Sequence, residues 1–219
     1  MSSYEDKIWL DGNRKLDGIC EDALDARAEL SNALILAHFK STLSIVEGRL
    51  SARAIDYKSY MPLDFSALCF RGHDTASTGV WVGLASYFRA RGSAPSSAPP
   101  STPMEQSRPA LRILVAEHHP LVSRDEAVLD AARSLGCDAQ VIHYTSLTDP
   151  LLNHFGGDRI RGLMTQMGME EQECISSPVI SRAIRNAQEK IQKQVQREMQ
   201  TNSPEEWFKF NLPPSNKSF

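Results

Sequence analysis

Cysteine is scarce in this sequence of 219 residues, and its four copies are widely separated. No two of them form a C-x-x-C pair: they are Cys20, Cys69, Cys137 and Cys174. The sequence therefore favours reduced cytosolic thiols over a disulfide framework or a zinc site. No run approaches the ~18 apolar residues of a membrane span. The N-terminal segment, MSSYEDKIWLDGNRK, lacks the basic region and apolar core of a secretory signal. We therefore expect a cytoplasmic protein.

Phosphate-binding motifs are also missing. Neither G-x-x-x-x-G-K-[ST] nor G-x-G-x-x-G occurs, and the turn that follows the apolar run 111–116 has the sequence EHHPLV. A nucleotide hydrolase needs a phosphate cradle and metal ligands before any other catalytic residue matters. A net charge of −3 argues against a general nucleic-acid binder. We expect no ATP hydrolysis, no catalytic residue, no cofactor, no metal and no nucleic-acid partner.

The N-terminal part has a helical pattern. Apolar residues spaced for one buried side predict a helix from Glu21 to Leu50, and His38 inside it is expected to be a packed or surface histidine. Two short apolar runs, 63–70 and 80–88, follow. The polar loop between them carries four residues of types used in catalysis: Arg71, His73, Asp74 and Ser77. No nucleophile motif such as G-x-S-x-G stands nearby, so we interpret this segment as an ordinary loop.

Residues 92–109 (GSAPSSAPPSTPMEQSRP) are rich in proline, serine and alanine and have no apolar period. Such a composition is typical of a linker. We therefore expect a mainly helical N-terminal module of unknown role at 1–91, a C-terminal unit at 110–200 and a tail at 201–219.

The C-terminal unit begins with a β-α-β pattern. An apolar run at 111–116 predicts a buried strand, 125–135 a helix closed by Gly136, and 139–144 a second strand. Such a unit forms parallel strands with a right-handed crossover. The fold class is α/β, with this small unit followed by long C-terminal helices.

Two helices are predicted after this unit. Asp158 caps the first, 159–167, and Gly168 stands at its C-terminus. Ser177 caps the second, with Pro178 at its first position. The second helix carries one narrow apolar stripe: Ile180, Ile184, Ala187, Ile191, Val195 and Met199. A helix with such a stripe has to lie against another surface.

This C-terminal stretch resembles a known family. FGGDRIRGLM, then MGMEE, then SRAIRNAQEKI are similar to SecA, the bacterial preprotein translocase ATPase, at the end of its second nucleotide-binding domain and the start of its scaffold helix. Upstream, LRILVAEHH and YTSLTDPLL stand in place of the family's T-E-R-H and S-L-E-D-D-L segments. Where the family has an arginine-rich helicase motif, this chain has Leu129, Ala131 and Ser134 in place of arginines.

The resemblance implies a catalytically inactive SecA-related protein, an accessory, regulatory or remnant component of protein export that acts by protein contact. Its expected partners are a full-length translocase ATPase or a second copy of the chain, with membrane association only through a partner. The expected partner-binding residues are Arg159, Arg161, Arg182, Ile184, Arg185, Ile191 and Val195. The opposing interpretation is that these residues pack the chain's own helices.

Two alternatives belong to other classes. RILVAEHHPLV resembles the opening of receiver domains in signalling proteins, although Glu117 is its only acidic residue and no phospho-accepting aspartate follows in the expected setting. A small metal-dependent enzyme would use Glu117, His118, His119 and His143. Adjacent strand residues point to opposite faces, so His118 and His119 are not expected to bind one ion together.

Overall fold

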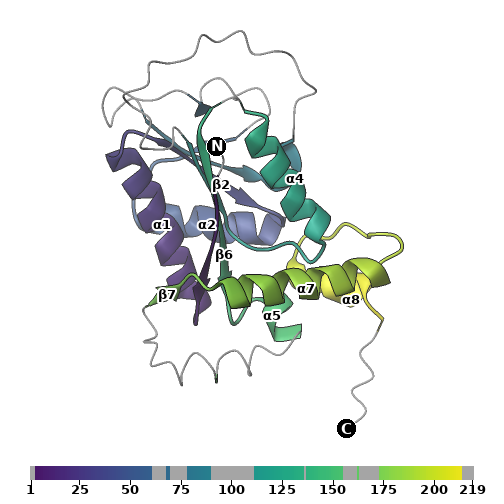
Figure 1. The fold of residues 1–219 in the computed structure, drawn as a ribbon. Helices are drawn as coiled ribbons and strands as arrows, with labels where there is room; N and C mark the ends of the chain where they lie inside the picture. The colour runs from purple at the N-terminus through teal and green to yellow at the C-terminus, as the bar shows by residue number, and fades with distance from the viewer. Residues whose placement is uncertain are drawn as a thin grey trace.

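The computed structural model describes residues 3–60, 68–69, 78–89, 111–135, 137–154, 162 and 173–213. These residues form a seven-stranded sheet with the strand order β3-β4-β2-β5-β6-β1-β7 (Figure 1). The strands are β1 (Ser3–Trp9), β2 (Asn32–Ala37), β3 (Lys58–Ser59), β4 (Val80–Leu84), β5 (Leu111–Val115), β6 (Ala139–Ser146) and β7 (Cys174–Ile175). All neighbours pair in parallel except β7, which is antiparallel to β1. The α/β fold class is therefore confirmed.

Helices cover both faces of this sheet. They are α1 (Gly12–Ala28), α2 (Lys40–Ala52), α4 (Val122–Arg133), α5 (Pro150–His154), α7 (Pro178–Gln194) and α8 (Pro204–Asn211), with a short 3-10 turn at Ala85–Tyr87. None of the helices in the described ranges has the length and apolar composition needed to cross a bilayer.

The central strand β2 shows how the two faces are built. All six of its residues are buried, as expected for a parallel strand covered on both sides. Ala33 and Ile35 belong to the core formed with α1 and α2, whereas Leu34 and Leu36 belong to the core formed with α4. Because successive strand residues point to opposite faces, α1 and α2 cover one face and α4 covers the other.

The predicted β-α-β unit is confirmed as β5, α4 and β6, with Leu111 opposite Ala139 in the parallel register. The second C-terminal helix is also confirmed: α7 begins at Pro178, directly after Ser177. It ends at Gln194, earlier than its apolar stripe suggested, and Met199 is 56% exposed. The first C-terminal helix, 159–167, falls outside the described residues apart from Gly162.

The prediction of one helix from Glu21 to Leu50 is wrong. Helix α1 ends at Ala28, Leu30 has a left-handed φ of 60°, and β2 then occupies the middle of the stretch. The physical reason is that a short apolar run buried on both sides has no period of its own, so it cannot be told from a buried helix by pattern alone.

The expected division into an N-terminal module and a C-terminal unit is corrected by the sheet. Strand β1 pairs with β6, and β2 pairs with β5, so the two parts of the chain alternate in one sheet and share its cores. The predicted linker, 92–109, falls outside the described residues. The expected tail, 201–219, is corrected as well. It contains helix α8, whose Trp207 is 0% exposed, so this part of the segment belongs to the folded core.

Candidate functional site

The parallel strands β1, β2, β5 and β6 all end at one edge of the sheet. The loops that follow them, together with α8, surround a cavity of about 430 Å³. At this edge β2 and β5 are neighbours, yet the helices that follow them, α2 and α4, pack on opposite faces. Open α/β sheets bind ligands at such a topological switch point. This edge is therefore the place to examine for function.

Glu117 lies at the switch point, directly after β5. Its Oε1 accepts hydrogen bonds from the backbone N–H groups of His38 and Phe39, both at 3.1 Å, and its Oε2 accepts one from the Thr42 hydroxyl at 2.6 Å. Phe39 is the N-cap of α2 and has no capping side chain, so Glu117 supplies the cap from another strand. Burial raises the pKa of Glu117. Both oxygens of Glu117 are therefore engaged within the chain.

Carboxylates also occupy the loops after β1 and β6. Asp11 accepts hydrogen bonds from two backbone N–H groups in the first turn of α1, at 2.8 and 3.2 Å. Asp149 accepts one from the backbone N–H of Ser146 at 3.0 Å, and it binds the ammonium of Lys15 at 2.8 Å. Three backbone donors in these loops and the ammonium of Lys15 are therefore paired with the protein's own acids.

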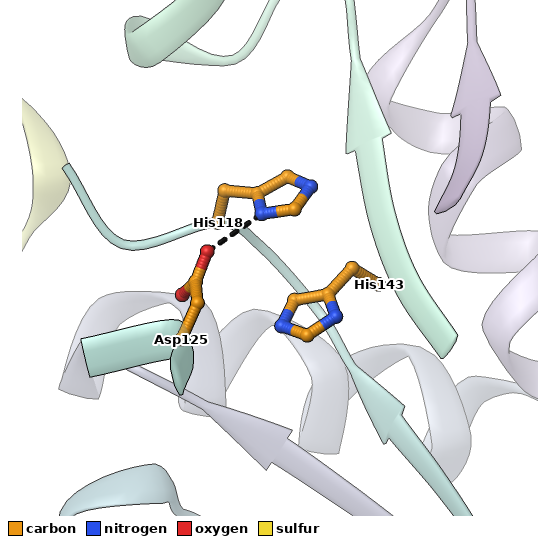
Figure 2. Close-up of side chains that lie close together, drawn as sticks. All are labelled: His118, Asp125 and His143. Carbon is orange, nitrogen blue, oxygen red and sulfur yellow. Dashed lines mark hydrogen bonds and ion pairs between the residues drawn. The ribbon is translucent and has the colours of Figure 1, made fainter. Parts of the chain in front are cut away.

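A buried cluster of histidines and aspartates adjoins this edge (Figure 2). His118 Nδ1 lies 2.7 Å from Asp125 Oδ2, and His118 Nε2 lies 3.3 Å from Asp6 Oδ1. Burial opposes charging of His118, but the hydrogen bond and charge of Asp125, followed by those of Asp6, raise its pKa to about 10. Burial likewise opposes ionisation of Asp6, but the hydrogen bond and charge of His118 lower its pKa to about 2. His118 is thus an imidazolium held between two carboxylates.

Asp125, in the first turn of α4, ties several elements together. Its Oδ1 accepts a hydrogen bond from the backbone N–H of His119 at 3.0 Å and lies 2.9 Å from Nε2 of His38, which follows β2. Its Oδ2 accepts a second bond from Gln188 of α7 at 2.7 Å. Burial opposes its charge, but the hydrogen bond and charge of His118 hold the pKa of Asp125 well below its usual value. Asp125 therefore links the ends of β2 and β5 to α4 and α7.

His143 stands apart from this network. It projects from β6 and is 0% exposed, and its ring stacks on that of His118 with 4.7 Å between centroids and 6° between planes (Figure 2). Neither of its ring nitrogens has a hydrogen-bond partner among the described residues. Burial is the main reason that its pKa falls to about 3, so the ring is neutral. Two buried polar atoms without a partner among the described residues are unusual in a folded protein.

Three of these residues have the composition of a metal site. His118, Asp125 and His143 offer ligand atoms that all lie within 4.8 Å of one another. The metal-dependent alternative drawn from the sequence used different ligands: Glu117, His118, His119 and His143. His118 and His143 do meet, but Glu117 caps α2, and His119 turns away with its Nε2 3.3 Å from Glu198. Asp125 carried no sequence signal, because a single aspartate in a helical pattern is ordinary.

Comparisons with known proteins match only part of this chain at the level of sequence. No protein-family model matches the chain. Protein translocase subunit SecA of Nitratidesulfovibrio vulgaris is 40% identical over 82 residues, which are 37% of this chain and 10% of that protein. SecA of Campylobacter jejuni subsp. doylei is 39% identical over 82 residues, with the same coverage, and that of Acidithiobacillus ferrooxidans is 37% identical over 82 residues, covering 9% of its length.

This chain contains a SecA-like segment. The match spans about a tenth of the length of these curated SecA relatives. Among solved structures, the C-terminal part of the Fun30 ATPase domain aligns with 80% of this chain and 54% of its own, with 10% sequence identity and a TM-score of 0.42.

The resemblance to SecA predicted a docking surface on α7. The apolar residues of that surface are instead packed inside the chain. Ile184 and Ile191 are each 1% exposed and share a core cluster with Ile8 and Trp207, so the chain itself covers them. Val195 is half-buried at the edge of the same cluster.

The predicted arginines of the SecA-like stretch have different outcomes. Arg182 and Arg185 are exposed on α7, and Arg185 lies 2.6 Å from Glu126 of α4. Arg159 and Arg161 fall outside the described residues, as do the loop residues Arg71, His73, Asp74 and Ser77.

Two cysteines that no sequence motif pairs are neighbours in the fold. Cys69 and Cys137 are far apart in the chain, but they lie close enough in the fold that Cys137 lowers the pKa of Cys69 and Cys69 raises the pKa of Cys137. Spacing along the sequence gave no sign of this contact.

Proposed function

We propose that this chain is a SecA-related component of protein export that has no ATPase activity and acts by contact with another protein. The SecA-like segment supports the link to export. The apolar stripe of α7 is buried in the chain, so the link to a partner rests on the exposed basic residues of this helix, which include Arg182, Lys190 and Lys193.

The observation that carries the inactive assignment is the set of carboxylates at the carboxyl edge of the sheet. Phosphate groups bind in this fold at helix N-termini, where free backbone N–H groups and positive charge meet. Here Asp11 and Glu117 already accept those hydrogen bonds at α1 and α2, and Asp149 pairs with Lys15. These carboxylates place negative charge where a phosphate would bind, and Asp149 already engages the nearby lysine.

Nucleotide binding tests this assignment directly. We expect that ATP or ADP with Mg²⁺ leaves the thermal unfolding midpoint of the full chain unchanged and that no phosphate is released. A ligand at one hundred times its Kd would stabilise the native state by about 2.7 kcal/mol, which is several degrees in a melting curve. A shift of that size, or measurable turnover, would refute the inactive assignment.

Partner binding needs a separate experiment. The two candidate partners are a purified full-length SecA and a second copy of this chain, measured by titration calorimetry and by sedimentation respectively. The variant Arg182→Glu/Arg185→Glu reverses the exposed charge of α7 and is expected to weaken the interaction. Arg133→Glu on α4 is the control, because Arg133 is also exposed but lies on another helix. Equal binding by both variants, or no binding by the wild type to either partner, would contradict the contact proposal.

A further inference from the structure

We propose that His118, Asp125 and His143 bind one divalent transition-metal ion. The three side chains come from different elements, the end of β5, the first turn of α4 and the middle of β6, and they converge in the interior with ligand atoms within 4.8 Å of one another. Two imidazoles and one carboxylate form a ligand set that suits Zn²⁺, Co²⁺ or Fe²⁺ better than Mg²⁺ or Ca²⁺.

His143 is the independent observation that points to a ligand. Its ring is fully buried, and both of its nitrogens lack a hydrogen-bond partner among the described residues. A buried imidazole without partners is unfavourable unless something that is not part of the polypeptide satisfies it. We assign this group as a metal ion because a second histidine and an aspartate lie beside the ring.

The surroundings supply the outer support that metal ligands require. Asp125 is oriented by hydrogen bonds from Gln188 and from the backbone N–H of His119, and His118 is flanked by Asp6. Such outer partners fix the orientation of ligands and tune their affinity. They belong to α7, the β5–α4 loop and β1, so an ion at this point would fasten α4 to the sheet.

The ligand atoms have to move closer to bind an ion. Bonds of about 2.1 Å in a tetrahedral site place ligand atoms about 3.4 Å apart, against the 4.8 Å limit observed here. An imidazole binds a metal through a lone pair in its ring plane, so the parallel stack of the His118 and His143 rings has to open. Rotation of the His143 ring does this without breaking a hydrogen bond, since the ring makes none within the described residues. Ligation also displaces the hydrogen between His118 and Asp125, as metal binding at histidine commonly releases a proton.

Of the three ligands, His118 also lines the cavity at the carboxyl edge. With three protein ligands, the fourth position remains open to a water molecule or a small ligand. This inference is independent of the proposed role in protein export, and either can fail without the other.

The experiment uses the full chain stripped with a chelator and then titrated with Co²⁺ and Zn²⁺. We expect one Co²⁺ per chain, visible bands of tetrahedral or five-coordinate Co²⁺, no thiolate charge-transfer band, displacement by Zn²⁺ and a higher melting temperature. No binding would mean that ordered water satisfies His143, and a thiolate band would mean adventitious binding at cysteine. Either result overturns the proposal.

Variants identify the ligands. His143→Phe keeps an aromatic ring to stack on His118 but has no ligand atom, and it is expected to fold at least as well as the metal-free wild type while losing about 100-fold or more in Co²⁺ affinity. Asp125→Asn, which removes the anionic ligand, should lose a comparable factor. His154→Gln, which changes an exposed histidine, is the matched control and should bind as the wild type does. Wild-type affinity in His143→Phe refutes the site; if neither variant folds, X-ray absorption of the wild type decides between imidazole and sulfur ligands.

Discussion

Replacing Ile184 by alanine tests whether the apolar stripe of α7 belongs to the core of this chain or to a docking surface. Its side chain is 1% exposed and lies in the core cluster that also contains Ile8, Leu151 and Trp207. Replacement by alanine removes three carbon atoms from this cluster. At about 0.8 kcal/mol per buried methylene group, the transfer contribution alone is about 2.4 kcal/mol.

A cavity contribution adds to this figure, because a packed interior relaxes only in part around a deleted side chain. We therefore expect Ile184→Ala to lower the free energy of unfolding by roughly 3 to 4 kcal/mol, within the usual range for such changes. Val179, on the same helix, is 72% exposed, and Val179→Ala is the matched control with an expected change of at most about 0.5 kcal/mol.

Urea-induced unfolding of the full chain, followed by far-ultraviolet circular dichroism, measures both values, and the slope with urea should stay the same in the two variants. A loss below about 1 kcal/mol for Ile184→Ala would refute the assignment of this side chain to the core. If the same variant also lost binding to a partner without losing stability, the stripe would be a docking surface after all.

Two further predictions concern the C-terminal segment. Trp207→Ala should destabilise the chain by about 3 to 5 kcal/mol in the same urea assay, whereas Phe210→Ala on the exposed side of α8 should change it by at most about 0.5 kcal/mol; equal effects would mean that α8 is a loosely attached tail. Hydrogen bonds, first from His119, lower the pKa of Glu198 from 4.5 to about 2. Since the folded-state pKa lies below the ordinary value, the stabilisation from Glu198 is complete above about pH 4.5 and is lost as the pH falls towards 2. Glu198→Gln should flatten this part of the stability curve and Glu205→Gln should not; an unchanged acid limb in Glu198→Gln would contradict the shift.

The sequence alone predicted the elements whose signals are local. The apolar run at 111–116, the helix that follows it and the strand at 139–144 agree with β5, α4 and β6, because the neighbours along the chain already define a buried strand or a one-sided helix. Ser177 and Pro178 marked the start of α7 for the same reason. The absence of a phosphate-loop motif is likewise evident from the sequence.

These local signals could not predict which distant strands pair with one another. Ser3 lies opposite Gln140, and Asn32 lies opposite Leu111, so residues far apart in sequence decide that one sheet forms instead of two modules. Strand β2 was assigned to a helix because a run buried on both faces shows no period until the sheet that buries it is known.

The candidate site depends on tertiary structure for the same reason. His118 and Asp125 are near each other in sequence, but His143 joins them only through the parallel pairing of β5 and β6. The apolar stripe of α7 was evident from its spacing, and the need for a covering surface followed from it. What covers Ile184 was decided by the folded chain, because β1, α5 and α8, among other segments, bring side chains to that core cluster from separate parts of the sequence.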